Sequence, residues 1–111
     1  MSFIPDGTSA SPSGFSAGAT YAGIKTYGDG KLDLAILVSD RDCNVAATFT
    51  RNRLRSAAID VNEERLTAAH WTGRGVVVNA GCANSSTGEQ GRIDGRRMCE
   101  LAEEAAGELE Q

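Results

Sequence analysis

The stretch Gly75–Gly91, GVVVNAGCANSSTGEQG, contains the signals that decide the fold. Its β-branched run Val76–Val78 is typical of a buried strand, and the small, turn-forming residues Asn79–Gly81 end that strand. The segment Thr87–Gln90 has the pattern of a capping box, in which the threonine hydroxyl accepts from the N–H three residues on and the glutamine side chain reaches back. The sequence therefore predicts a strand, a turn and a helix that begins at this threonine.

The predicted helix N-terminus offers groups that bind negative charge. The first backbone N–H groups of a helix have no partner within it, and the helix dipole places partial positive charge there. Gly88 has no Cβ, so a substrate oxygen can approach its backbone closely, and the Thr87 hydroxyl is a second donor beside it. Capping boxes also occur on helices that bind nothing, so an ordinary connection between strand and helix fits these residues as well.

Composition places the chain among acidic proteins of one small folded domain. It has 111 residues, of which 41% are hydrophobic, and a net charge of −4. The charge and the absence of a basic stripe argue against nucleic acid as a partner. No run is long enough to span a bilayer, and Met1–Gly14 lacks the order of a signal peptide, so we expect a cytoplasmic protein without membrane contact. The cysteines (Cys43, Cys82, Cys99) lack CxxC spacing and predict reduced thiols, and with His70 as the single histidine a metal site is not expected.

The first half of the chain predicts an irregular arm followed by strands. Residues 1–16 are rich in Ser, Gly and Pro and are expected to form an exposed arm, with the folded domain over 17–111. Both faces of 32–39 are apolar, so this strand is expected to lie centrally and to be covered on both sides. The other predicted elements are strands over 20–26, 44–50 and 56–61, with turns at 27–31 and 40–42.

The second half predicts two helices around the strand at 75–79. Asn62 is a suitable N-cap for a short helix over 63–69, with acids in the first turn where the dipole favours them. Strands followed by helix, strand and helix favour an α+β fold built as a layered sheet.

The segment 88–109 carries an apolar stripe at helical spacing, with acids on the opposite face. This pattern predicts a helix that packs on the sheet by its stripe. Gly91 and Gly95 weaken its beginning, so we expect the regular part to start near Asp94 and the preceding residues to form a separate turn.

The segment NAGCANSSTGEQG resembles the NSGNANACTGEQG segment of the ornithine acetyltransferase family, the bifunctional glutamate N-acetyltransferases of arginine biosynthesis. Other blocks, in matching order, are similar to the N-terminal region of that family, and we interpret them as structural. The resemblance covers nearly the whole chain and implies the N-terminal portion of the self-cleaving ornithine acetyltransferase and aminopeptidase type of α/β sandwich. The additional blocks are Gly14-Phe15 with Ala17-Gly18, Ala22–Lys25, Asp33–Asp40 and Ala46–Arg53.

The resemblance implies an enzyme that moves an acetyl group from N-acetylornithine to glutamate without a cofactor, with acetyl-CoA as an alternative donor substrate. In the family the Thr-Gly pair forms the oxyanion hole, a role that falls here on Thr87 and Gly88. The family's nucleophile is a threonine freed by self-cleavage of a precursor within a Lys-Gly-Thr-Met-like segment. Attack on an amide creates a tetrahedral oxyanion, which one preorganised donor stabilises by roughly 3–4 kcal/mol.

The chain departs from the family pattern at several points. It contains no Lys-Gly-Thr-Met-like segment, so alone it is not expected to be the complete enzyme. The nucleophile and the substrate-binding residues are expected on the remaining α-chain segment and on a β chain that begins with Thr, in a heterotetramer. Cys82 stands where the family usually has Asn and is expected to be at least half-buried. Ser86 stands where the family often has Cys, and only His70 is available to pair with it.

Two alternatives stay open from the residues. A related family of self-processing aminopeptidases shares the architecture, although the STGEQG stretch favours the arginine-pathway enzymes. A non-catalytic interaction domain that binds an anion such as a carboxylate at its helix N-terminus is also consistent with the missing nucleophile.

Overall fold

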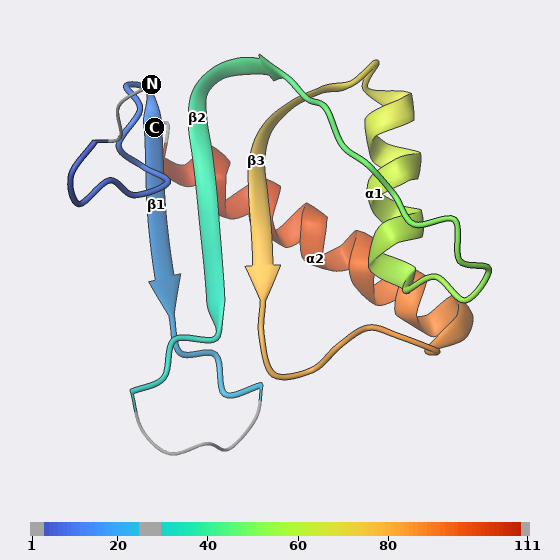
Figure 1. The fold of residues 1–111 in the computed structure, drawn as a ribbon. Coiled ribbons are helices and arrows are strands. Elements are labelled where there is room, and N and C mark those ends of the chain that lie inside the picture. The colour runs from blue at the N-terminus through green and yellow to red at the C-terminus, as the bar shows by residue number, and fades with distance from the viewer. Residues whose placement is uncertain (1–3, 25–29, 110–111) are drawn as a thin grey trace.

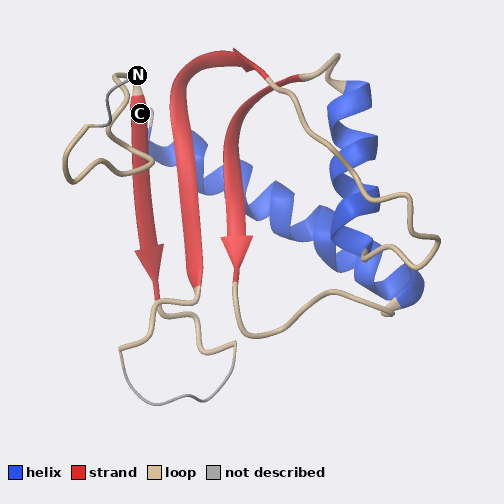
Figure 2. Cartoon of the chain, viewed as in Figure 1, coloured by secondary structure: helices blue, strands red, loops and turns tan. Residues whose placement is uncertain are grey.

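An antiparallel sheet and two helices form the part of the chain that the computed structural model describes, residues 4–24 and 30–109. Figure 1 shows the path of the chain through these elements, and Figure 2 separates helices from strands. In chain order the elements are β1 (Phe15–Thr20), β2 (Leu34–Asn44), α1 (Ala57–Ala68), β3 (Thr72–Asn79) and α2 (Gly88–Leu109).

The sheet has the order β1-β2-β3, with both pairs antiparallel. Ile36 of β2 lies opposite Gly18 of β1 on one side and Val77 of β3 on the other. The strand predicted over 32–39 is therefore central, as its apolar character indicated. The α+β class with a layered sheet is confirmed.

One face of the sheet is covered by α2, which runs behind the strands in Figure 1. Within the described residues no helix lies on the opposite face, so the prediction that β2 is covered on both sides is wrong. The run Val76–Val78 is likewise not fully buried. Val77 is half-buried, whereas Val76 and Val78 each expose 56% of their surface, because neighbouring residues of a strand point to opposite faces.

The tightest packing lies between the two helices. Val61 of α1 is only 2% exposed, and a Cβ built on Gly95 of α2 would lie 3.2 Å from its Cγ2. Around this contact, ion pairs join Asp60 to Arg92 at 3.3 Å and Glu64 to Arg96 at 3.0 Å. Both pairs repeat at four-residue spacing on each helix, which places them side by side along the helix–helix contact.

The N-terminal half differs from the sequence prediction. The first strand is Phe15–Thr20, which begins inside the arm expected over 1–16, and residues 21–24 have no strand conformation. The remaining part of the strand predicted over 20–26 and most of the turn predicted at 27–31 lie outside the described residues. The observed strand pairs with β2 through its backbone, and small residues such as Gly18 and Ala19 give little local signal for that pairing.

Residues 40–56 also differ from the prediction. β2 continues through the expected turn at 40–42 to Asn44, with an irregularity in its pairing to β3 between Val38 and Cys43. Residues 45–56 contain neither strand nor helix, so the predicted strand over 44–50 is wrong. This segment is held by tertiary contacts, since the N–H of Val45 donates to the carbonyl of Trp71 at 2.8 Å and the ring centroids of Phe49 and Trp71 are 6.3 Å apart.

The strand predicted over 56–61 is wrong as well, because those residues begin α1. Ser56 is the N-cap, with extended backbone angles, and Asn62 lies within the helix and does not cap it. Alanines favour a helix intrinsically. The burial of Ala57 and Val61, the latter beside Gly95 of α2, stabilises this helix further. The predicted helix end near Ala69 agrees with the observed end at Ala68. At the other helix, α2 is regular from Gly88, so the expected start near Asp94 is wrong.

The start of β2 is fixed by the Asp33 carboxylate. Its Oδ1 accepts from the N–H of Ala22 at 2.6 Å and its Oδ2 from the N–H of Ile24 at 3.0 Å. These bonds, the one from Ala22 above all, hold the pKa of Asp33 below the usual 3.8 because they favour the charged form. A lowered folded-state pKa adds stability above the unfolded pKa, and that stability is lost as the pH falls through the folded pKa.

We expect Asp33→Asn to lower the melting temperature at neutral pH, since an amide NH₂ cannot accept the second hydrogen bond. The difference from the parent protein should shrink as the pH falls below 3.8, where the parent carboxylate also takes up a proton. Thermal unfolding followed by circular dichroism between neutral pH and about pH 3 measures this. Asp6→Asn, at an exposed carboxylate of the N-terminal segment, is the control. Equal pH dependence in both variants would contradict the role of Asp33.

Candidate functional site

The start of α2 has an open, exposed backbone. Thr87 precedes the helix and Gly88 is its first residue, and both are exposed. The backbone is left-handed on either side of Thr87, with φ of 56° at Ser86 and 63° at Gly88, a conformation that glycine adopts without strain. A Cβ on Gly88 would meet nothing within 4 Å. A ligand atom therefore has room to approach the backbone at this position.

The predicted capping box does not form. The Gln90 side chain donates to Asp94 Oδ1 at 2.8 Å and does not return to Thr87, and the Thr87 hydroxyl donates to Asn84 Oδ1. The first helical hydrogen bond runs from the N–H of Gly91 to the carbonyl of Thr87, at 3.4 Å. Within the described part of the chain, the N–H groups of residues 88–90 consequently have no partner. These donors remain available to an anionic ligand at the positive end of the helix dipole.

Asn84 ties the site together, and the sequence analysis missed it. Its Oδ1 accepts from the Thr87 hydroxyl, its Nδ2 donates to the carbonyl of Gly91 at 2.7 Å, and its backbone carbonyl accepts from the N–H of Ala57 at 3.0 Å. One half-buried residue thus connects the loop and the first turn of α2 through its side chain, and the start of α1 through its backbone. From the sequence alone, an Asn between a strand and a helix indicates only a turn. The partners that give Asn84 its position lie seven and 27 residues away in the chain, so the sequence does not reveal them.

Gly91 leaves space for neighbouring side chains, although glycine is a poor helix former. It is buried, and a Cβ at this position would lie 1.8 Å from Thr87 Oγ1 and 2.5 Å from Asn84 Oδ1. Any side chain at this position therefore competes for the space that the Asn84–Thr87 pair occupies.

A small pocket of about 80 Å³ lies between the starts of α1 and α2. It brings the Thr-Gly pair next to two arginines that the sequence analysis did not single out. Its lining residues are Arg55, Ala57, Asp60, Ser86, Thr87, Gly88 and Arg92.

Both arginines of the pocket are already paired with carboxylates. Arg55 lies 3.1 Å from Asp60 and also contacts Glu63, while Arg92 lies 3.3 Å from Asp60 and 3.2 Å from Glu89. The hydrogen bond to Glu63 chiefly raises the pKa of Arg55, and the bond to Glu89 chiefly raises that of Arg92. The guanidinium charges are thereby balanced locally. Arg55 Nε is nevertheless buried without a hydrogen-bond partner in the described chain. The neutral donors beside it are the backbone N–H groups at the start of α2 and, when it turns, the Thr87 hydroxyl.

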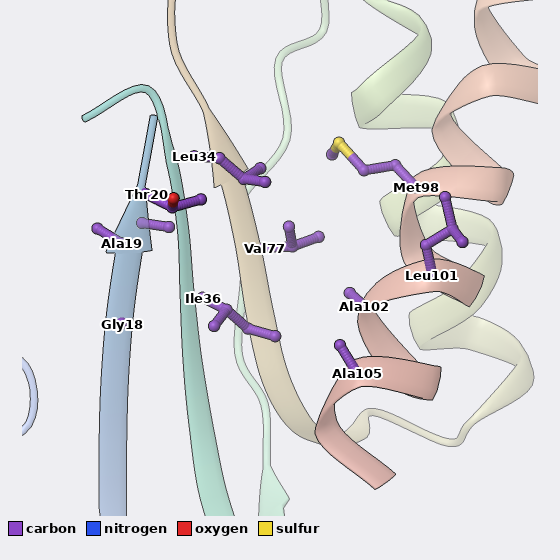
Figure 3. A pocket seen from close by; sticks show the side chains of 11 residues that line it. Gly18, Ala19, Thr20, Leu34, Ile36, Val77, Met98, Leu101, Ala102 and Ala105 are labelled. Atoms are coloured by element: carbon purple, nitrogen blue, oxygen red, sulfur yellow. The ribbon is translucent and has the colours of Figure 1, made fainter. Parts of the chain in front are cut away.

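A larger, apolar groove of about 390 Å³ separates the sheet from α2. Figure 3 shows that the stripe of α2 faces the strands across this space, as the helical spacing predicted. None of the side chains that line it is charged, and the hydroxyl of Thr20 is the polar side-chain group among them. The lining residues are Gly18, Ala19, Thr20, Leu34, Ala35, Ile36, Val77, Met98, Leu101, Ala102 and Ala105.

Two other residues considered from the sequence lie outside this arrangement. Cys82 is an exposed free thiol, so the expectation that it is at least half-buried is wrong. Ser86 lines the pocket at the start of α1, whereas His70 follows the far end of that 12-residue helix, about 18 Å away at 1.5 Å per residue. The structure does not bring Ser86 and His70 together.

The described ranges, 4–24 and 30–109, have neither a metal-binding cluster nor a membrane-spanning helix. They contain no group of three or more His, Cys, Asp or Glu side chains placed to hold a metal ion. Neither of the two helices in these ranges is long and apolar enough to cross a bilayer.

Comparison with known sequences gives a consistent family. The model of the ArgJ family matches residues 16–111. The arginine biosynthesis bifunctional protein ArgJ of Dehalococcoides mccartyi is 44% identical over 105 residues, which are 95% of this chain and 25% of that protein. The mitochondrial protein of the same name from Arthroderma otae is 38% identical over 110 residues, covering 98% of this chain and 23% of the relative. The chain spans about a quarter of the length of these curated relatives.

Solved structures show the same similarity in three dimensions. The arginine biosynthesis bifunctional protein ArgJ of Bacillus halodurans matches with a TM-score of 0.77 at 30% identity, over 86% of this chain and 48% of that one. The ornithine acetyltransferase of Mycobacterium tuberculosis, solved in complex with ornithine, matches with a TM-score of 0.67 at 37% identity, over 78% and 43% of the two chains. The fold expected from the resemblance is thus confirmed. Three of these four relatives are named as arginine biosynthesis proteins and the fourth as an ornithine acetyltransferase, and none of the four is named as an aminopeptidase.

We expect the same substitution at two glycines of α2 to have opposite effects on stability. Gly91→Ala inserts a methyl group into occupied space and should lower the free energy of unfolding by about 1–3 kcal/mol. Gly107→Ala points into open space and should raise it by up to about 1 kcal/mol, because alanine is the better helix former. Urea unfolding of the purified protein compares the two variants. A Gly91→Ala variant as stable as the parent would show that the Asn84–Thr87 pair does not depend on this space.

Proposed function

The chain belongs to the ArgJ family, and from this membership we propose that it supplies the oxyanion hole of an acyltransferase in arginine biosynthesis. The proposed reaction moves an acetyl group from N-acetylornithine to glutamate. One observation carries the assignment to residues: Thr87 and Gly88 lie exposed beside a pocket at the start of α2, next to N–H groups without partners in the described chain. These two residues also match the Thr-Gly pair of the resembling family segment.

In the proposed first step, a threonine hydroxyl from outside this chain attacks the acetyl carbon of N-acetylornithine. The new C–O bond turns the acetyl oxygen into an oxyanion, which receives hydrogen bonds from the Gly88 N–H and the Thr87 hydroxyl. The C–N bond then breaks, the nitrogen takes up the proton that the threonine hydroxyl gave up, and ornithine leaves an acetyl-threonine ester behind. In the second step the glutamate amine attacks this ester through a like intermediate, and the threonine hydroxyl is restored.

Neutral donors suit this task at the observed position. The nearby guanidinium groups are held by Asp60, Glu63 and Glu89, so they do not form a strong ground-state site for a carboxylate. Backbone N–H groups at a helix start are fixed before the reaction, which is the condition for stabilising charge that develops only in the transition state.

The other parts of the enzyme are proposed to lie on further polypeptide. The sequence contains no Lys-Gly-Thr-Met-like segment, and the chain spans about a quarter of its curated relatives. We place the nucleophile and the substrate-binding residues on the remaining α-chain segment and on a β chain that begins with Thr, assembled as a heterotetramer. Acetyl-CoA is an alternative donor that an assay of the complete enzyme distinguishes. The expected cytoplasmic location stays a prediction, since some relatives are named as mitochondrial proteins.

Replacing the Thr87 hydroxyl tests the oxyanion role. In the complete acetyltransferase that contains this chain, Thr87→Ala should lower kcat for acetyl transfer by about 10²–10³-fold, the usual effect of removing one oxyanion donor. The melting temperature should stay close to that of the parent, because Thr87 is exposed. Ser85→Ala removes a neighbouring exposed hydroxyl and should leave kcat unchanged. An unchanged rate in a folded Thr87→Ala enzyme would rule out this role.

The proposed partner chain is tested by mass. Intact-mass spectrometry of the protein purified from its native source under non-denaturing conditions should show a second polypeptide whose N-terminal residue is Thr. Denaturing the sample should separate the two without reduction, because the proposed association is non-covalent. Isolation of this chain unaccompanied, at a mass of 11.6 kDa, would argue against the two-chain enzyme.

A further inference from the structure

We propose that Asn84 is the positioning residue of the oxyanion hole. It holds the Thr87 side chain by accepting a hydrogen bond from the Thr87 hydroxyl, until an oxyanion accepts that hydrogen bond instead. This inference rests on the proposed function, because it concerns the donor that the reaction uses. It adds a residue that acts through Thr87 and does not itself touch the reacting atoms.

The direction of the hydrogen bonds follows from Gly91. The carbonyl of Gly91 can only accept, so the side-chain atom of Asn84 that lies 2.7 Å from it must be the NH₂ group. The other end of the amide, Oδ1, then faces Thr87. Because Oδ1 can only accept as well, the Thr87 hydroxyl must be the donor. The position of its single proton is therefore determined by the backbone carbonyl of α2.

Asn84 is itself held in place before any substrate binds. Its backbone carbonyl accepts from the N–H of Ala57 at 3.0 Å, which fixes the loop to the start of α1. The absence of a Cβ on Gly91 leaves the space in which the amide and the hydroxyl meet. Asn84 thus makes three hydrogen bonds, two through its side chain and one through its backbone carbonyl, and Thr87 is oriented by a group that does not need to move.

This arrangement makes Thr87 a donor that responds to developing charge. A neutral substrate carbonyl offers the hydroxyl no stronger acceptor than the neutral amide of Asn84 already does. A tetrahedral oxyanion is a stronger acceptor, since charge-assisted hydrogen bonds are roughly twice as strong as neutral ones. Rotation about the Cβ–Oγ bond of Thr87 then moves the proton from Asn84 to the oxyanion. The interaction is gained in the transition state and not in the ground state, which raises kcat and leaves KM unaffected.

A double-mutant cycle on the complete acetyltransferase tests the proposal, with Asn84→Ala, Thr87→Val and the double variant. We expect Asn84→Ala to lower kcat about tenfold, the factor that corresponds to the coupling of directly contacting residues, with KM unchanged within about twofold. In the Thr87→Val background, Asn84→Ala should have less than about a twofold effect on kcat, because there is no hydroxyl left to position. Asn79→Ala, which removes the loop amide that donates to the Cys82 carbonyl at 3.2 Å, is the matched control and should leave kcat unchanged.

Three results would overturn the proposal, and they differ from one another. An equal loss of kcat in both backgrounds would mean that Asn84 only supports the fold. A higher kcat in Asn84→Ala would mean that Asn84 competes for the proton and does not position it. An unchanged kcat in folded Thr87→Val would refute the proposed oxyanion role of Thr87, and this inference with it. If Asn84→Ala does not fold, Asn84→Ser retains a donor for Gly91 with a shorter side chain, and the same cycle applies to it.

Discussion

The missing Cβ of Gly91 is the constraint on which the arrangement of the site depends. At this point the first turn of α2 leaves room for the side chains of Asn84 and Thr87, and Gly95, one turn later, leaves room for Val61 of α1. The two glycines cost helix propensity, of the order of 1 kcal/mol each. In return, the loop and both helices come into direct contact, which places the Thr-Gly pair over a pocket shared by the two helix starts.

The charged side chains around the contact between α1 and α2 are paired with one another. The carboxylates of α1 pair with arginines of α2 at matched spacing, Asp60 with Arg92 and Glu64 with Arg96. Partly exposed pairs of this kind contribute little stability each, roughly 0–1 kcal/mol, so burial of Val61 contributes more to holding the helices together. The pair between Asp60 and Arg92 also balances charge in the pocket beside the Thr-Gly pair.

The sheet and the helix pair are covered to different degrees. The apolar residues buried in the described chain, Ala57 and Val61, belong to α1 and its contacts, whereas Val76 and Val78 are 56% exposed on the sheet. A groove of about 390 Å³ separates the sheet from α2. The site therefore depends on the better-packed half of the chain.

The sequence by itself determined the features that depend on neighbouring residues. The central strand and the strand that ends at Asn79 follow from apolar runs and turn residues, and the family follows from the same letters. The start of α2 was only partly predictable, since the capping box does not form and the regular helix begins at Gly88 and not near Asp94. Only the tertiary structure decided that Ser56 and not Asn62 begins α1, and that Thr87 is held by Asn84 and not by a capping box. The physical reason is distance along the chain. The partners of Asn84 extend from Ala57 to Gly91, and a backbone carbonyl or a missing Cβ acts on a side chain only after the fold has brought them together.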